Sequence, residues 1–120
     1  MFGTVVVLLI GGDLMAKARV EAASKRAGAE LVTAPSHDLE GALSRTRPEL
    51  LILDLDSGGA GLLDDLKGAL AKGLPPGRVV GFYSHIDDEL RRGALEAGCT
   101  PLPRGRFWRE LGDTIGGHGA

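Results

Sequence analysis

Short apolar segments of strand length alternate with longer segments of helical periodicity along the chain, and this alternation restricts the fold more than any other feature. Strands are expected over residues 4–10, 30–34, 50–53, 79–83 and 99–102. Residues 5–10 and 50–53 are apolar at every position, which is typical of parallel strands that are covered on both faces. Five strand–helix units of this kind predict an α/β domain in which helices cover both sides of an open parallel sheet.

Helices are expected after each strand, where apolar residues recur every three or four positions. Asp13 is suited to cap the first helix, which would run to about residue 27, and Pro48 ends the second. Ser57-Gly58-Gly59 is expected to form a loop, and Pro101 places the fifth strand at a sheet edge. The inward-facing helix positions are expected to be Ala16, Val20, Ala23 and Ala27; Leu39, Ala42 and Leu43; Leu62, Leu63, Leu66 and Leu70; Ile86, Leu90, Ala94 and Ala97; and Phe107, Leu111 and Ile115.

The length of 120 residues is that of one domain. A single domain is therefore expected over residues 1–120, ordered over about residues 4–115, with a flexible tail over residues 116–120. The 14 Lys and Arg and 16 Asp and Glu residues give a net charge of -2, which argues against direct nucleic-acid binding. The apolar runs are too short to span a membrane, and a single cysteine with no basic leader predicts a cytoplasmic location.

Polar residues follow four of the expected strands. In an open parallel sheet, ligands and chemistry collect at the carboxyl ends of the strands, so these residues are the candidates for a site. His37, His85 and Cys99 lack the spacing of metal ligands. The candidates are Asp13 after the first strand, Asp54 and Asp56 after the third, Tyr83 and Ser84 after the fourth, and Arg104 after the fifth.

Residues 48–54, Pro-Glu-Leu-Leu-Ile-Leu-Asp, resemble the third strand of response-regulator receiver domains. Residues 96–99, Glu-Ala-Gly-Cys, are similar to the exit from the fourth helix in that family, and the order of the units matches over residues 4–115. The resemblance implies a flavodoxin-like, three-layer sandwich with strand order 2-1-3-4-5. It also implies that Asp54 is the phospho-acceptor candidate in a two-component phosphorelay.

The chain departs from the receiver pattern around Asp54. Receivers hold Mg²⁺ with an acidic pair after the first strand, and Gly11 and Gly12 occupy those positions here. Asp13 and Asp54 would form only a weak metal site, with Asp56 nearby in the sequence. The receiver hydroxyl position falls on Tyr83 or Ser84, and the lysine position falls near Arg104, which could pair with Asp54.

These departures predict a pseudo-receiver that signals through protein contacts without conventional Mg²⁺-dependent phosphorylation, without a cofactor and without enzymatic activity. The first alternative is a conventional stand-alone response regulator that uses Mg²⁺ and is phosphorylated on Asp54. The second is a small flavodoxin-like protein that binds a nucleotide or phosphate at Gly11-Gly12. The dinucleotide fingerprint is incomplete for this second alternative, because Asp13 and Ala16 stand where further glycines belong.

The expected partner is a signalling protein, either a histidine kinase or an output protein. Receiver-like domains commonly pair through the fourth and fifth units, so a homodimer is also expected there. Charges of both signs on these units could form a self-complementary surface. A ring near the surface is expected at Trp108, because Phe107 can fill the core position. The interface candidates are Arg91, Arg92, Trp108 and Arg109.

Overall fold

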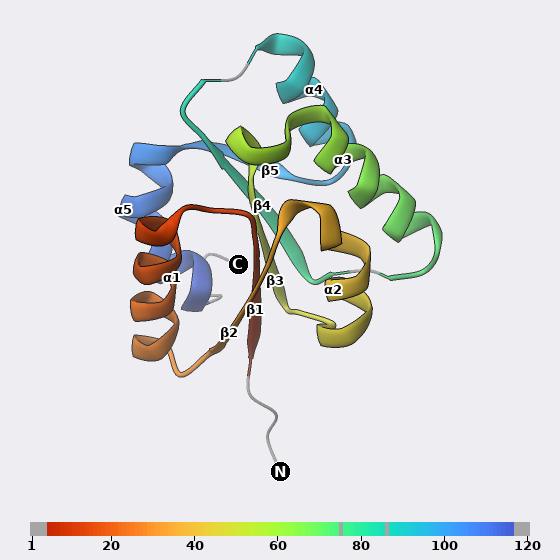
Figure 1. Cartoon of the computed structure of the whole chain (residues 1–120). Helices are drawn as coiled ribbons and strands as arrows, with labels where there is room; N and C mark the ends of the chain where they lie inside the picture. Colours follow the sequence, from red (N-terminus) through yellow and green to blue (C-terminus); the bar gives the residue numbers. More distant parts are fainter. Residues whose placement is uncertain (1–4, 75, 86, 117–120) are drawn as a thin grey trace.

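The computed structural model describes residues 5–74, 76–85 and 87–116, and contains a parallel sheet of five strands in the order β2-β1-β3-β4-β5 (Figure 1). The expected topology is therefore confirmed. The expectations at residue 4, Ile86 and residues 117–120 lie outside the described residues. The strands are β1 (Val6–Ile10), β2 (Glu30–Ala34), β3 (Leu50–Asp54), β4 (Arg78–Tyr83) and β5 (Thr100–Pro103).

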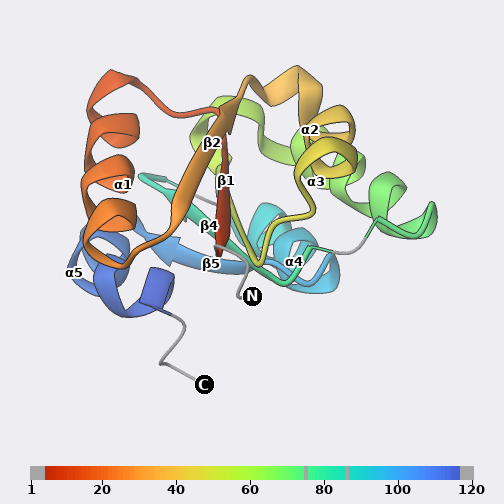
Figure 2. The same ribbon diagram turned by 90° about the horizontal axis from the view of Figure 1, so that it is seen from below.

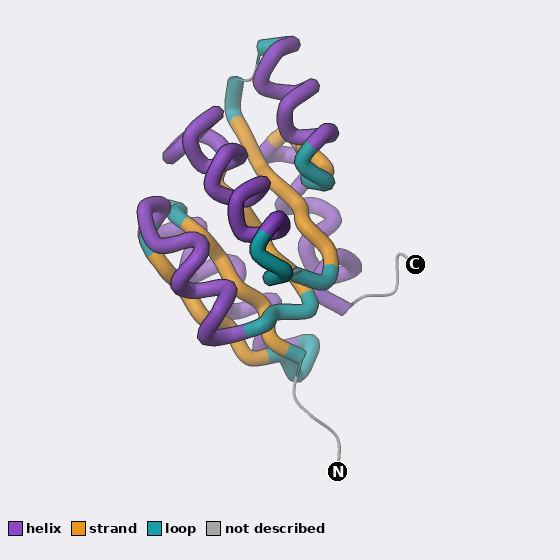
Figure 3. Tube along the Cα trace, turned by 90° about the vertical axis from the view of Figure 1, so that its right-hand side faces the viewer, coloured by secondary structure: helices purple, strands orange, loops and turns teal. Residues whose placement is uncertain are grey.

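Five α-helices cover the sheet from both sides, as the view from below in Figure 2 shows. Two of them pack on one face and three on the other, and Figure 3 shows the second face with its helices in front of the strands. A short 3₁₀ turn (Ser36–Asp38) precedes the second helix. The first face carries α1 (Leu14–Arg26) and α5 (Arg104–Gly116); the second carries α2 (Leu39–Thr46), α3 (Leu55–Ala71) and α4 (Asp88–Glu96).

Alternate residues of the central strands belong to opposite cores, which explains why these strands are apolar throughout. Val7 and Leu9 of β1 pack with α1 and α5, whereas Leu8 and Ile10 pack with the helices of the other face. All four side chains are fully buried. Polar side chains are consequently absent from β1 and from residues 50–53 of β3, and the one charge of β3, Asp54, stands at its last position.

The register brings the strand ends together at one edge of the sheet. Ile10 pairs with Leu53, Asp54 with Phe82, and Tyr83 with Pro103. The edge position expected for the strand containing Pro101 is confirmed, because β5 pairs only with β4. Among the described residues, none of the helices is both long and apolar enough to cross a membrane.

Some local expectations were wrong. Ser57-Gly58-Gly59 is not a loop: α3 begins directly after β3 and continues through a kink at Gly59, where φ is 51° and ψ is -133°. Leu70 is 37% exposed, and Ala69 takes the buried position instead. Position 69, three residues after Leu66, faces the core, whereas position 70 is turned away from it. Ala27 is exposed because it caps the end of α1.

The contact between β4 and α3 yields a paired stability prediction. A Cβ atom at Gly81 would lie 2.7 Å from Leu55 Cδ1 and 2.9 Å from Cys99 Sγ, and both of these side chains are buried. Gly81→Ala should therefore lower the free energy of unfolding by about 1–3 kcal/mol through overpacking. Urea denaturation measures this change.

Gly68→Ala is the matched control, because a Cβ there meets nothing within 4 Å. Alanine is the better helix former, so this variant should gain about 0.5–1 kcal/mol. A Gly81→Ala protein as stable as the wild type would contradict the close packing of β4 against Leu55.

Candidate functional site

Asp54 is a buried carboxylate at the end of β3, with only 3% of its surface exposed. One carboxylate oxygen accepts a hydrogen bond of 3.0 Å from the amide of Asp56, and the other accepts one of 2.8 Å from the Ser57 hydroxyl. A guanidinium nitrogen of Arg104 lies 3.7 Å from the second oxygen. These partners offset the cost of burying the charge.

Asp56 links the third, fourth and fifth strand ends. Its carboxylate oxygens accept hydrogen bonds of 3.1 and 3.0 Å from the amide of Ser84, which follows β4. One of these oxygens also accepts a hydrogen bond of 3.1 Å from Nε of Arg104. Partial burial raises the pKa of Asp56. The hydrogen bonds from Ser84 and Arg104 together lower the pKa by more than burial raises it, so it lies below its usual value.

Arg104 is the cation of the site and the first residue of α5. Its guanidinium lies 4.8 Å from the centre of the Phe82 ring, which supports its position by a cation–π contact. The pairing with Asp54 is present, but the shorter contact is with Asp56, at 3.1 Å against 3.7 Å. A planar guanidinium can meet two carboxylates in this way, whereas a lysine ammonium is a single point charge.

The glycines after β1 adopt a backbone conformation that disfavours an acidic pair at these positions. Gly11 has φ of 78° and Gly12 has φ of 93°, both in the left-handed region that side chains rarely adopt. A Cβ on Gly11 would also lie 3.3 Å from Cβ of Asp54 and 3.2 Å from the Ser57 hydroxyl oxygen. A carboxylate at Gly11 would therefore require the loop to change conformation.

Asp13 serves the start of α1 rather than extending the cluster around Asp54. Its side chain accepts a hydrogen bond of 2.8 Å from the amide of Ala16, as the expected helix cap. Within residues 5–74, 76–85 and 87–116, no group of three or more histidine, cysteine, aspartate or glutamate side chains could hold a metal ion.

The two residues at the hydroxyl position have different surroundings. Tyr83 is half-buried and packs against the core on the α2–α4 side. Ser84 is exposed and contributes its backbone amide to the site. Sequence reasoning missed Ser57 as a partner of Asp54, although an aspartate followed three residues later by serine is a spacing that can bring their side chains together at a helix start.

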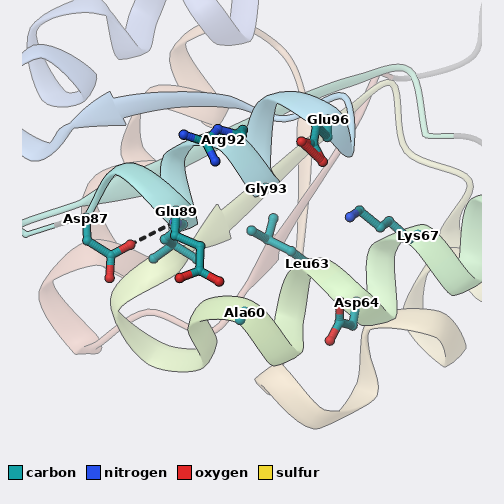
Figure 4. Close-up of a pocket in the computed structure, with 10 residues that line it drawn as sticks. Ala60, Leu63, Asp64, Lys67, Asp87, Glu89, Arg92, Gly93 and Glu96 are labelled. Atoms are coloured by element: carbon teal, nitrogen blue, oxygen red, sulfur yellow. Dashed lines mark hydrogen bonds between the residues drawn. The ribbon is translucent and has the colours of Figure 1, made fainter.

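Two hollows lie on the surface, one beside the strand ends and one between two helices. One, of about 340 Å³, adjoins the expected phosphate position at Gly11 and Gly12 and is also lined by Lys17, Ser36 and Ser57. The other, of about 530 Å³, lies between α3 and α4 and is drawn in Figure 4. Charged side chains of both signs line this second hollow, including Asp64, Lys67, Asp87, Glu89, Arg92 and Glu96.

The interface candidates fall into two groups. Arg91, Arg92 and Arg109 are exposed, as expected. Trp108 is half-buried, so its ring lies near the surface as expected, while Phe107 fills the core position. The Trp108 ring lies 4.9 Å from the Phe107 ring, with Arg19 of α1 stacked at 5.1 Å. Phe107 belongs to the α1–α5 core, and Trp108 packs against that core from its margin.

The whole chain resembles solved receiver structures. A CheY-like receiver domain protein from Methanospirillum hungatei has a TM-score of 0.80 at 16% identity, with 97% of this chain and 94% of that chain covered. A response regulator from Thermotoga maritima has a TM-score of 0.75 at 17% identity, with 96% and 99% covered. The Vibrio cholerae chemotaxis protein CheY4 has a TM-score of 0.77 at 16% identity, with 94% and 97% covered.

No protein-family model matches the sequence, and no curated protein matches it either. The fold is nevertheless clear: the chain has the flavodoxin-like receiver fold of two-component response regulators. At identities of this order the comparison identifies the fold, and the function depends on the residues of the site.

The lowered pKa of Asp56 predicts acid sensitivity. Because its folded-state pKa lies below the ordinary 3.8, Asp56 stabilises the fold at pH values above 3.8. This contribution is lost as the pH falls below 3.8 through the folded-state pKa. Asp56→Asn should therefore show a smaller loss of unfolding free energy than the wild type between about pH 6 and about pH 3, measured by urea denaturation.

Asp65→Asn is the control, since Asp65 is an exposed carboxylate on α3. It should keep the pH dependence of the wild type. Parallel pH profiles for wild type and Asp56→Asn would show that the bonds from Ser84 and Arg104 do not stabilise the carboxylate.

Proposed function

We propose that this chain is a cytoplasmic, receiver-like signalling domain that acts through protein contacts, without catalysis and without Mg²⁺-dependent phosphorylation. The observation that carries the proposal is that both carboxylate oxygens of Asp54 already accept hydrogen bonds within the chain. Its carboxylate is buried and both oxygens accept hydrogen bonds from its own helix start, through the amide of Asp56 and the hydroxyl of Ser57. A phospho-acceptor must instead present an oxygen to an incoming phosphorus atom.

The region after β1 supports the same proposal. Mg²⁺ prefers several oxygen ligands in octahedral geometry, and phosphoryl transfer depends on the metal to offset charge on the phosphate. Gly11 and Gly12 supply no side-chain oxygen, and Asp13 is engaged at its helix cap. A domain with this arrangement retains the receiver fold as a scaffold for binding.

The partner in this proposal is a signalling protein, a histidine kinase or an output protein. The relatives by fold are receiver proteins of response regulators and chemotaxis, which supports a partner of that kind. A second copy of the chain is a further partner, through α4 and α5. On α4, Leu95 is 56% exposed and lies one helical turn from Arg91 and Arg92, so an apolar residue is flanked by charges there.

The conventional alternative, phosphorylation on Asp54, keeps one supporting observation. Asp54 does lie at the carboxyl end of β3, with Arg104 3.7 Å away as a cation that could stabilise a phosphoryl group. The absence of carboxylates at Gly11 and Gly12 makes it the second candidate.

Phosphorylation can be tested directly. Incubation with acetyl phosphate, or with beryllofluoride, in the presence of Mg²⁺ should leave the mass of the protein and the amide signals of residues 54–57 unchanged. The reason is that the Asp54 oxygens are already engaged and the metal ligands are missing. Intact-mass spectrometry and NMR provide the readouts.

Asp54→Asn serves as the control for nonspecific modification. A stoichiometric aspartyl phosphate in the wild type that is absent from Asp54→Asn would contradict the proposal and establish the conventional alternative.

Self-association is tested by sedimentation. A salt-sensitive dimer is expected at micromolar concentration, and Leu95→Gln should weaken it by about tenfold if Leu95 is central to the interface. Leu14→Gln, at an 85% exposed leucine on α1, is the matched control and should not weaken it. Trp108→Ala is a poor probe, because it also removes packing against Phe107.

A wild-type protein that remains monomeric across this range would remove the dimer from the proposal. Equal weakening by the Leu95 and Leu14 variants would place the interface elsewhere.

A further inference from the structure

Two hydrogen-bond donors from different strand ends converge on one carboxylate, that of Asp56. One donor is the backbone amide of Ser84, the residue after β4. The other is Nε of Arg104, the first residue of α5. A backbone amide beside a guanidinium is a donor set suited to oxyanions such as carboxylate and phosphate, because both groups donate and one is permanently charged.

The group between these donors is the side chain of Asp56. Its oxygens lie 3.0 and 3.1 Å from the Ser84 nitrogen, and one of them lies 3.1 Å from Arg104 Nε. The backbone amide of the same residue donates to Asp54. Asp56 thus connects the buried carboxylate of Asp54 to the donors of Ser84 and Arg104.

We infer that Ser84 and Arg104 form an oxyanion-binding site that the carboxylate of Asp56 fills from within the chain. The domain is thereby held in an anion-bound arrangement without any external anion. A ligand on the same chain has a high effective concentration, so a free anion must displace it to bind. The chemical class that the site accepts when it is vacated is a small oxyanion of the phosphate or carboxylate type.

The neighbouring charges are compatible with such a site. Asp54 would repel an added anion, but its oxygens already accept bonds from Asp56 and Ser57 and lie near Arg104. The present structure already places two carboxylates beside one guanidinium. Ser84 is exposed, so a small anion can reach its amide from solvent.

The test removes the internal anion and supplies an external one. Asp56→Ala should bind inorganic phosphate or formate, and its melting temperature should rise by about 3 °C or more in tens of millimolar of either salt. Sodium chloride of equal ionic strength is the reference. The wild type should show no such rise, because Asp56 occupies the donors.

Asp65→Ala, which removes one exposed carboxylate from the same helix, is the matched control and should behave as the wild type. Asp56→Ala combined with Arg104→Gln should lose the response, because the cation of the site is gone. A rise in Asp65→Ala equal to that in Asp56→Ala would overturn the inference, since it would reflect net charge alone.

A second variant covers the case in which Asp56→Ala does not fold. Asp56→Ser keeps a polar residue in the first turn of α3 but is too short to fill the site. Phosphate titration should shift the Ser84 amide signal in this variant and leave it unchanged in the wild type. A shift of equal size in the wild type, or none in the variant, would overturn the inference.

These measurements use the isolated chain and need neither Mg²⁺ nor a partner. Their outcome is therefore independent of whether the domain docks on a signalling protein or is phosphorylated on Asp54.

Discussion

Burial of β1 and β3 on both faces is the constraint on which the rest of the structure depends. Because helices cover each side of the sheet, every position of β3 must be buried, and an unpaired polar group within it would be costly. The charge that the strand does contain, Asp54, stands at its last residue, where the start of α3 and Arg104 can reach it. Ser84 and Arg104, which follow β4 and β5, lie at the same edge, since parallel strands end together.

The strand ends are joined by an arrangement of two carboxylates and one guanidinium. Asp54 provides the buried charge, Asp56 bridges to the amide after β4, and Arg104 contacts both carboxylates from the start of α5. Each carboxylate is met by donors of the chain itself, and the guanidinium is met by both carboxylates. This arrangement is the physical reason for our proposal that the domain acts through its surface rather than through chemistry at Asp54.

Much of the fold could be predicted from the sequence, and less of the site. The two-sided core followed from apolar runs such as residues 50–53, because burial on two faces leaves a local trace in the sequence. The strand order 2-1-3-4-5 came instead from the resemblance to receiver domains. The candidate residues Asp54, Asp56, Ser84 and Arg104 were all found from their places after strands. The bond from Ser57 was missed because residues 57–59 were assigned to a loop, and glycine-rich segments favour loops without excluding a kinked helix. The partial exposure of Trp108 was expected, but the stacking of Arg19 on its ring was not, because that contact joins two helices far apart in the sequence.

The sequence by itself determined the class of fold, the strands that lie at its centre, and the edge at which polar residues meet. These properties depend on hydrophobic periodicity, which is local and survives many changes of side chain. Only the tertiary structure decided that Arg104 lies closer to Asp56 than to Asp54, and that the Ser84 amide completes the set. These contacts join residues 28 and 48 positions apart. Hydrogen bonds weaken steeply with distance and angle, so such pairing is decided by how the packed helices and strands place their ends, which no local pattern records.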